Sequence, residues 1–327
     1  MDVLYPLKFE PVFIEKIWGG NKIRTMMNMP EAPSVHCGES WVLSGVPGNE
    51  SVVKNGPLKD NTLNELVEIY MGELVGDKLF HEYGEIFPVL IKFIDANDWL
   101  SIQVHPDDKL ASERHDSFGK TEMWYILEAE NGSELISGFK KDVEKPEYIE
   151  RVSDSSLKEI LNFEKVERND VFYIPAGRVH ALGPGILLAE IQQTSDITYR
   201  IYDWDRLDAS GLPRDLHTEQ AVAAIDFSKT TQAKTAYNQK TNETNELVNS
   251  DKFTTNLLEL DKGLKKDYSE LDSFVAYVCI EGNMKIQIQD NGAVFLTKGE
   301  TVLIPNALNE VEIYPQNKVK FLEVYVT

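Results

Sequence analysis

The sequence predicts a mainly β protein with few helices, folded into two β-barrel or β-sandwich domains. Short runs in which apolar and polar residues alternate, such as LSIQVH, recur along the chain, and this alternation is typical of strands with one buried face. Turn signals that contain glycine or proline separate the runs, as in many barrels and sandwiches. Two stretches in the last third also echo two earlier ones, which indicates two related units.

The elements can be assigned in order along the chain. Strand-like runs, LKFEPVF and ESWVLSG, come first. The run TLNELVEIYMGELVGDKL then predicts a helix, because its apolar residues have helical spacing and Thr62 and Glu65 form a capping box. Short strands are expected next in FPVLIKFIDA, LSIQVH, EMWYILEA, VFYIPAG and GILLAEIQQT, and short helices in SLKEILNF and TEQAVAAI.

An internal repeat and a polar stretch together suggest the domain boundaries. EMWYILEAENG, which starts at Glu122, is echoed by VAYVCIEGNMK, which starts at Val275, and NDVFYIPAGRVHAL is echoed by GETVLIPNALNEV. The second copy lacks the glutamate and has no histidine after its proline, so we expect that unit to be structural. The residues between the units are mostly polar. We therefore expect a catalytic, metal-binding domain with short helices (1–226), a linker or surface excursion (227–250) and a metal-free C-terminal β domain (251–327).

Charge and cysteine content disfavour several classes of function. The net charge of −21 argues against a nucleic-acid partner, because phosphate binding needs a basic face. We expect no membrane association, since no apolar run is long enough to span a bilayer and the first residues lack a basic-then-apolar signal. Cys37 and Cys279 lie far apart in no motif, which favours a cytoplasmic protein. No feature indicates a protein partner, and an anionic ligand would need a local cluster of cations.

Four polar side chains on or just after short strands are the candidate metal ligands. Gln103 and His105 are two residues apart on one strand, so they share a face. Glu122 and His180 accompany two other strands. A single histidine is more often a solvated or hydrogen-bonded side chain, but two imidazoles, a carboxylate and an amide oxygen together suit Zn²⁺ or a similar divalent ion. These donors also admit Mn, Fe, Co or Ni.

Charged side chains interrupt the same strands. Lys120 has the parity of Glu122, so both should face one cavity. Lys92 interrupts the apolar run PVLIKFI, where a lysine lies either at a sheet edge or toward a polar lumen. A long polar face follows in AEIQQTSDITYRIYDWDR, and its charged candidates are Glu190, Asp196, Arg200 and Arg206. Together the cations would provide the local positive site that an anionic ligand requires.

At these residues the chain resembles a known family, the type I mannose-6-phosphate isomerases in their short bacterial form. The stretches that carry the resemblance are FPVLIKFIDANDWLSIQVHPDD, GKTEMWYIL, PAGRVHAL and LAEIQQTSDITYRIYDWDR, with PLKFEPVFIEKIWGG and GESWVLS near the start. The resemblance covers about the first two thirds of the chain, whereas the last third resembles the second, metal-free cupin barrel of that family more loosely. It implies two cupin-type jelly-roll barrels and interconversion of mannose 6-phosphate and fructose 6-phosphate with one Zn²⁺ per chain.

The resemblance also implies roles for individual residues. The zinc ligands would be Gln103, His105, Glu122 and His180. Arg200 would be the active-site arginine, and the lysines around the sugar phosphate would be Lys92 and Lys120. Ser101 and Arg206 are further candidates for substrate binding, Arg206 through the phosphate. The general base stays open between Asp196 and Glu190, with a lysine of lowered pKa such as Lys120 as a further choice. Two alternatives are another metal-cupin enzyme and a sugar-phosphate-binding cupin that no longer turns over.

Overall fold

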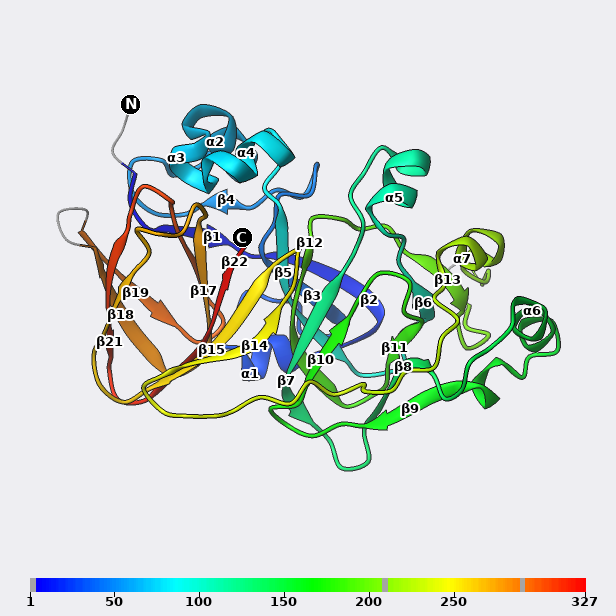
Figure 1. Ribbon diagram of the computed structural model, residues 1–327. Coiled ribbons are helices and arrows are strands. Elements are labelled where there is room, and N and C mark those ends of the chain that lie inside the picture. The colour runs from blue at the N-terminus through cyan, green and yellow to red at the C-terminus, as the bar shows by residue number, and fades with distance from the viewer. Residues whose placement is uncertain (1–3, 208–210, 289–291) are drawn as a thin grey trace.

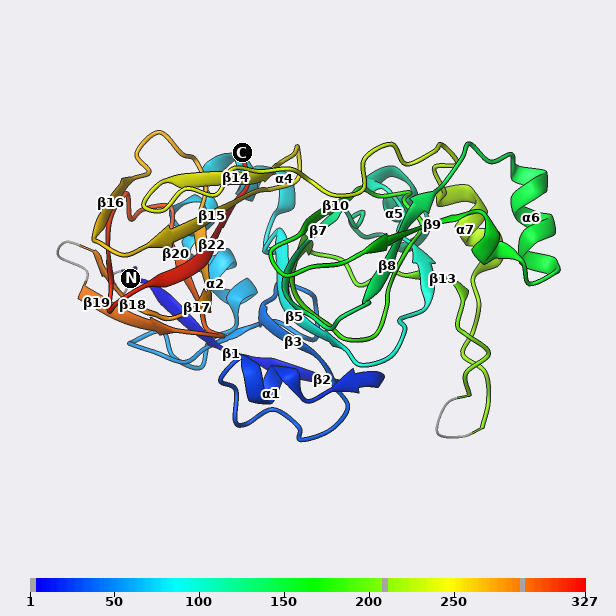
Figure 2. The same ribbon diagram turned by 90° about the horizontal axis from the view of Figure 1, so that it is seen from below.

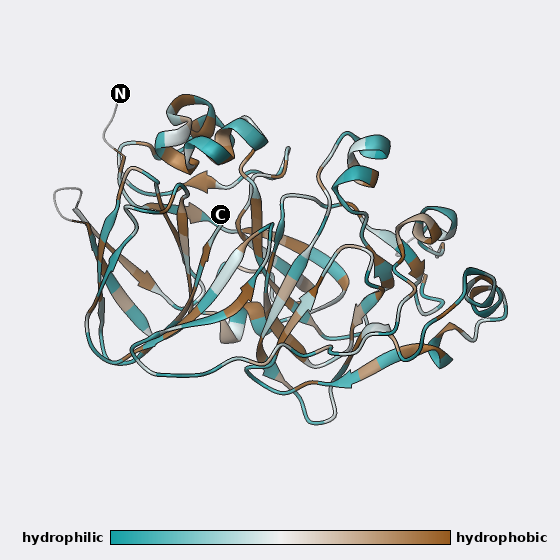
Figure 3. Cartoon of the chain, viewed as in Figure 1, coloured by the Kyte–Doolittle hydropathy of each residue, from teal (hydrophilic) through white to brown (hydrophobic). Residues whose placement is uncertain are grey.

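The computed structural model describes residues 4–207, 211–288 and 292–327. Antiparallel strands form four sheets, which pack as two barrels side by side (Figure 1). The predicted mainly β fold with two jelly-roll barrels is therefore confirmed. Hydrophobic and hydrophilic residues alternate along many of the strands (Figure 3), as expected when one face of a strand lines a core.

The N-terminal barrel consists of a six-stranded and a five-stranded sheet. The order of the first is β10 (Val171–Ile174), β7 (Glu122–Ala129), β12 (Ile186–Gln193), β5 (Val89–Ala96), β2 (Val12–Gly20) and β3 (Cys37–Leu43). The order of the second is β13 (Tyr199–Tyr202), β6 (Ile102–Val104), β11 (His180–Leu182), β8 (Glu134–Phe139) and β9 (Leu161–Lys165). The strands predicted to carry the site belong to both sheets.

The C-terminal barrel consists of a seven-stranded and a four-stranded sheet. The order of the first is β14 (Thr244–Asn249), β15 (Thr254–Leu260), β22 (Val319–Tyr325), β17 (Val275–Glu281), β20 (Thr301–Ile304), β1 (Leu7–Glu10) and β4 (Val52–Val53). The order of the second is β16 (Leu264–Asp267), β21 (Glu310–Pro315), β18 (Asn283–Ile288) and β19 (Gly292–Thr297). Strands near both ends of the chain thus lie in this barrel (Figure 2).

The boundary between the barrels differs from a simple division along the sequence. Strand β1 pairs with β20, so the start of the chain completes a sheet of the C-terminal barrel. Strand β14 begins within the polar stretch 227–250, and its Leu247 and Val248 are buried. One hydrophobic cluster, which includes Leu7, Ile191 and Val324, runs through both barrels. The two units therefore share a core.

Seven α-helices and one 3₁₀ turn occur in residues 4–207, 211–288 and 292–327. They are α1 (Lys22–Met26), α2 (Leu63–Tyr70), α3 (Gly72–Val75), α4 (Asp77–Tyr83), α5 (Asp108–His115), α6 (Lys145–Ser153), α7 (Thr218–Ala224) and η1 (Leu157–Glu159). None of the helices in these ranges has both the length and the apolar character needed to cross a membrane.

The helix predicted after Thr62 begins as expected but is divided. The capping box of Thr62 and Glu65 is present. Helix α2 stops because Met71 has φ = 49°, and α3 stops because Gly76 has φ = 100°. A Cβ at Gly76 would lie 2.4 Å from the carbonyl oxygen of Asp272, so this turn against the C-terminal barrel requires glycine.

The two short helix predictions had different outcomes. TEQAVAAI contains α7, as predicted. SLKEILNF forms only the turn η1 before β9 begins, so a helix there was wrong. Residues 161–165 pair with β8, and this tertiary pairing overrides a weak local helical preference.

Candidate metal centre and active site

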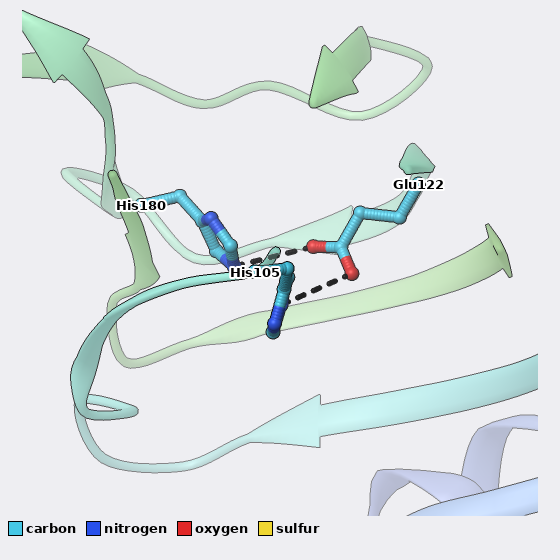
Figure 4. A group of neighbouring side chains, drawn as sticks. All are labelled: His105, Glu122 and His180. Carbon is cyan, nitrogen blue, oxygen red and sulfur yellow. Dashed lines mark ion pairs between the residues drawn. The ribbon is translucent and has the colours of Figure 1, made fainter. Parts of the chain in front are cut away.

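Three of the predicted ligands meet between the two sheets of the N-terminal barrel (Figure 4). His105 directly follows β6, Glu122 begins β7 and His180 begins β11. The glutamate lies between the imidazoles, with Oε2 3.5 Å from Nε2 of His105 and Oε1 3.3 Å from Nε2 of His180. One ligand atom from each residue lies within 4.8 Å of the others, so this group could hold a metal ion.

Backbone carbonyls fix the orientation of both imidazoles. Nδ1 of His105 lies 2.8 Å from the carbonyl oxygen of Ile197, and Nδ1 of His180 lies 2.9 Å from that of Arg178. Each Nδ1–H therefore donates to a carbonyl, which leaves a lone pair on each Nε2. In this structure Nε2 of His105 accepts from Lys120 and Nε2 of His180 from the amide of Gln103, and both atoms lie beside Glu122. Metal-binding histidines commonly have such a second hydrogen bond, because it sets the tautomer and the ring orientation.

Protonation in this group also suits a cation. Burial lowers the pKa of His180 to about 4 and, together with Lys120, lowers that of His105, so both rings are neutral near pH 7. Burial and the nearby Glu190 raise the pKa of Glu122 to about 7. Oε2 of Glu122 is buried, lies 3.2 Å from Nζ of Lys120 and accepts no hydrogen bond from the residues the structure describes. Because burial disfavours the charged form of Glu122, a divalent cation between it and the two neutral imidazoles would offset that cost.

Gln103 lies next to these three residues and can complete the donor set. It is paired in register with His180, and its Nε2 lies 3.2 Å from Nε2 of that histidine. Its Oε1 accepts a hydrogen bond from Oγ of Ser101 at 3.2 Å. The oxygen and nitrogen of an amide exchange places by rotation of the group, so Gln103 can present its oxygen to a cation.

A cavity of about 320 Å³ opens beside this group. Gln103 and His180 line it directly, which connects the candidate metal centre with the cavity. The other predicted residues that line it are Lys92, Ser101, Lys120, Glu190, Asp196 and Arg200. The structure therefore brings almost the whole predicted set to one place, because strand alternation directs these side chains into the same lumen.

Two of the lysines are closely paired with carboxylates. Nζ of Lys92 lies 2.9 Å from Glu190 and 3.8 Å from Glu39. Nζ of Lys120 lies 3.2 Å from Oε2 of Glu122 and 3.1 Å from Nε2 of His105, at the edge of the candidate metal centre. Both lysines are buried, so their charges are balanced by groups of the protein itself.

Glu190 and Glu39 are held as carboxylates by these cations. Burial by itself would raise the pKa of Glu190, but Lys92 and Lys120 outweigh it and lower that pKa. Oε2 of Glu190 also accepts a hydrogen bond from Nε1 of Trp124 at 2.7 Å. Burial would also raise the pKa of Glu39, but the nearby cations, mainly Lys92, outweigh burial and lower that pKa to about 2.

The two predicted arginines occupy different environments. Arg200 lines the cavity, and its Nη1 donates to the carbonyl oxygen of Asp215 at 2.8 Å. Arg206 is not among the lining residues and instead forms an ion pair with Asp203 at 2.7 Å. The chain reverses after β13, where Trp204 and Asp205 have φ values of 58° and 55°. The alternation of side chains along β13, which directs Arg200 into the cavity, therefore does not continue as far as Arg206.

Several residues of the cavity were missed from the sequence. Glu39 lies on the fully buried strand β3, and an acidic residue in such a run is the same signal that identified Lys92. Arg214 also lines the cavity, held by Asp203. No local pattern could have identified it, because its position depends on that tertiary contact. Lys16, Trp18, Trp41 and Trp124 complete the missed charged and aromatic lining.

Two family models match the chain. The model of the type I phosphomannose isomerase catalytic domain matches residues 6–156, and that of the mannose-6-phosphate isomerase cupin domain matches residues 243–325. Together they cover parts of both barrels.

Individual proteins are similar over nearly the whole length. A mannose-6-phosphate isomerase of Streptococcus mutans is 36% identical over 305 residues, which cover 91% of this chain and 93% of that protein. One from Bacillus subtilis is 34% identical over 314 residues, which cover 94% and 95%. The crystal structure of a mannose 6-phosphate isomerase from Bacillus subtilis aligns with a TM-score of 0.87 at 32% identity, covering 99% of this chain and 100% of that one.

Proposed function

The chain belongs to the type I phosphomannose isomerase family, and from this premise we propose that it interconverts mannose 6-phosphate and fructose 6-phosphate in a Zn²⁺-dependent reaction through an enediolate. One observation carries the proposal. The buried group of His105, Glu122 and His180, with both imidazoles neutral and oriented, adjoins a cavity lined by several cations. A phosphorylated sugar is an anionic substrate that fits such a cavity.

We assign the metal to Gln103, His105, Glu122 and His180. The donor set of two imidazole nitrogens, a carboxylate and an amide oxygen supports Zn²⁺, and it would leave a net positive charge on the centre. When bound, the ion supplies a Lewis acid that polarises the sugar carbonyl and its neighbouring oxygen. Ser101 holds the amide of Gln103 and also lines the cavity, so it can contact a hydroxyl group of the substrate.

Arg200 is assigned to the negative charge that develops on the substrate oxygens. Its guanidinium lines the same cavity as Gln103 and His180. Its Nε is buried and has no hydrogen-bond partner among the residues the structure describes, so a donor remains for a ligand. A preorganised cation at the site of charge development is a large source of transition-state stabilisation.

Asp196 is our choice for the general base over Glu190. Moving a proton between C2 and C1 of the open-chain sugar requires a carboxylate that can reach the substrate and release the proton again. Asp196 is exposed at the cavity. Both oxygens of Glu190 already have partners, Lys92 and Trp124. Glu190 is therefore better suited to fixing the charge of Lys92 than to exchanging protons.

The lysines support the chemistry at the metal end of the cavity. Lys120 lies beside the candidate ligands and can contact the sugar oxygens there or move a proton between them. Burial would lower the pKa of Lys92, but Glu190 and Glu39 outweigh it and raise that pKa, so this lysine stays protonated. It therefore binds as a cation and does not act as a base.

The test is conversion of mannose 6-phosphate to fructose 6-phosphate, measured on purified protein before chelation, after chelation and after addition of Zn²⁺. We expect activity to disappear with the chelator and to return with the metal. A folded, Zn²⁺-loaded protein that binds but does not convert mannose 6-phosphate would contradict the proposal and favour a sugar-phosphate sensor. Consumption of O₂ would instead indicate a different metal-cupin enzyme.

A further inference from the structure

The cations at the cavity differ in how far the protein already neutralises them. Among the residues described, three lysines and two arginines line the cavity. Lys16, Lys92 and Lys120 each lie within 4 Å of a buried glutamate. Arg200 forms its side-chain hydrogen bond to a backbone carbonyl. The positive charge that remains for an anionic ligand is therefore concentrated at the arginines.

Arg206 and Arg214 bind the same carboxylate, that of Asp203, but in different ways. Every nitrogen of the Arg206 guanidinium is engaged within the fold: Nε with the carbonyl oxygen of Asp203, Nη2 with its carboxylate, and Nη1 with the carbonyl oxygen of Trp99. Arg214 uses its Nε and Nη2 for Asp203, at 2.7 and 2.5 Å. Among the residues the structure describes, no hydrogen-bond acceptor is found for Nη1 of Arg214, so this end of the guanidinium can reach a ligand in the cavity that Arg214 lines.

The same contacts bring Arg214 close to Arg200. Asp215, the next residue in the chain, accepts the hydrogen bond from Nη1 of Arg200. Two residues further on, His217 donates its backbone N–H to the carbonyl oxygen of Arg200 at 2.7 Å. Two guanidinium groups that line one cavity repel each other unless an anion binds between them. Asp203 is 5% exposed and pairs with Arg206 and Arg214, and Arg206 also lies 3.5 Å from the exposed Asp98. Arg200 and Arg214 therefore share the single charge of Asp203, and a positive charge remains at the cavity.

We propose that Arg214 binds the phosphate group of the substrate and that Asp203 is its positioning residue. This inference rests on the proposed function, since it names which residue holds the phosphate of that substrate. Guanidinium groups bind phosphate through two parallel hydrogen bonds, and a second bidentate contact with a buried carboxylate fixes the plane of the group. Arg206 serves to hold Asp203, and it contacts no substrate.

The first test compares Arg214→Gln with Arg206→Gln in the Zn²⁺-loaded enzyme. Arg214→Gln should raise the KM for mannose 6-phosphate and the inhibition constant of inorganic phosphate by about 10- to 100-fold, the usual contribution of charge-assisted hydrogen bonds. Because a remote phosphate contact binds substrate and transition state alike, kcat should change much less. Arg206→Gln acts only through Asp203, so it should raise both constants no more than Asp203→Asn does, by at most about 10-fold. An effect of Arg206→Gln as large as that of Arg214→Gln would overturn the assignment.

Unphosphorylated mannose separates phosphate binding from a general structural effect. Mannose should inhibit the conversion of mannose 6-phosphate with the same inhibition constant in Arg214→Gln as in the wild type. An equal loss of affinity for mannose and for mannose 6-phosphate would overturn the proposal. If Arg214→Gln fails to fold, Arg214→Lys keeps the charge without the planar fork, and it should still raise the KM for mannose 6-phosphate.

A double-mutant cycle tests Asp203 as the positioning residue. Asp203→Asn should raise the KM for mannose 6-phosphate by about 3- to 10-fold in the wild-type background and have no further effect in Arg214→Gln. Additive effects in the two backgrounds would overturn the positioning role. Failure of the proposed function is a separate result: wild-type, Zn²⁺-loaded protein would convert no mannose 6-phosphate. If the wild type is active but Arg214→Gln has an unchanged KM, only the present inference fails.

Discussion

Each barrel has a buried glutamate on a central strand, Glu190 in the first and Glu323 in the second, and the surroundings of these two carboxylates differ. In the N-terminal barrel, Glu190 on β12 lies opposite Lys92 and Trp124 of the neighbouring strands. In the C-terminal barrel, Glu323 on β22 has two cross-strand neighbours in the same arrangement. The first carboxylate borders a cavity and a group of potential metal ligands, whereas the second lies in a closed network.

The C-terminal barrel supplies its own cation and donors to its carboxylate. Nζ of Lys266 lies 2.9 Å from Glu323, Nδ2 of Asn256 donates to it at 2.8 Å, and the hydroxyl of Tyr268 also donates to it. The hydroxyls of Tyr268 and Tyr277 are hydrogen-bonded to each other. A network in which protein groups satisfy each charge stabilises a core and binds no ligand.

The side chains on the strands that face Glu190 and Glu323 also differ between the two barrels. In the N-terminal barrel, Gln103 and His105 are two residues apart around β6 and direct neutral donors into the lumen. In the C-terminal barrel, Lys266 and Tyr268 have the same spacing around β16, and they bring an ammonium group and a hydroxyl instead. Where Glu122 begins β7, Val275 begins β17. The N-terminal barrel therefore has neutral donors that can bind a metal cation. At the equivalent place in the C-terminal barrel, the ammonium group of Lys266 is itself the cation.

The largest effect is expected from breaking the metal centre. His105→Ala should remove the bound metal and lower kcat/KM by on the order of 10³-fold or more, because one of the imidazole ligands is lost. Metal content by atomic spectroscopy and turnover of mannose 6-phosphate check this together. Tyr268→Phe is the matched control in the C-terminal barrel and should leave both unchanged. Tight metal retention with full activity in His105→Ala would contradict the ligand assignment.

The second prediction separates the role of the metal from the role of Arg200, a cation that lines the cavity. Arg200→Ala should lower kcat by roughly 10²- to 10³-fold, the usual loss when a charge-stabilising donor is removed from an active site. Its metal content should stay at the wild-type level, since Arg200 pairs with Gln103 through the backbone and its side chain hydrogen-bonds to the carbonyl oxygen of Asp215 instead of to a candidate ligand. A full-rate Arg200→Ala enzyme would remove this residue from the mechanism.

The third effect concerns a buried carboxylate of the N-terminal barrel. The pKa of Glu39 in the folded protein, about 2, lies below its ordinary value of 4.5. A lowered pKa stabilises the folded state above pH 4.5, and this stabilisation is lost as the pH falls toward 2. Glu39→Gln should therefore cost about 3 kcal/mol at pH 7, and less at pH 3. Urea unfolding of the wild type and of Glu39→Gln at pH 7 and at pH 3 measures this loss of stability. An equal loss in the free energy of unfolding at both pH values would contradict a role for the ionisation of Glu39.

Strand alternation explains why so much of the site could be predicted from the sequence. Gln103 and Lys120 are each two residues from a partner on the same face, so their common direction follows from local geometry. Arg214 could not be found this way, because the chain reverses after β13 and only the contact with Asp203 brings it to the cavity. The division of the helix after Thr62 likewise depends on Met71, whose positive φ no propensity indicates.

The smallest effect is expected in the C-terminal barrel and tests whether its network is purely structural. Lys266→Met removes the cation beside Glu323 but leaves that carboxylate its hydrogen bonds from Asn256 and Tyr268. The side chain of Lys266 is 17% exposed, so water can replace part of the lost contact. We expect a loss of about 1–3 kcal/mol in the free energy of unfolding, measured by urea denaturation.

Metal content and kcat should not change in Lys266→Met, because the network has no contact with the cavity of the N-terminal barrel. The two barrels share one hydrophobic cluster, so the loss of stability should appear as a shift of the whole unfolding transition. If Lys266→Met instead bound Zn²⁺ or lost activity at full folding, the second barrel would contribute to the chemistry. That result would contradict the interpretation that the N-terminal barrel binds a cation, whereas the core of the C-terminal barrel contains the cation of its own Lys266.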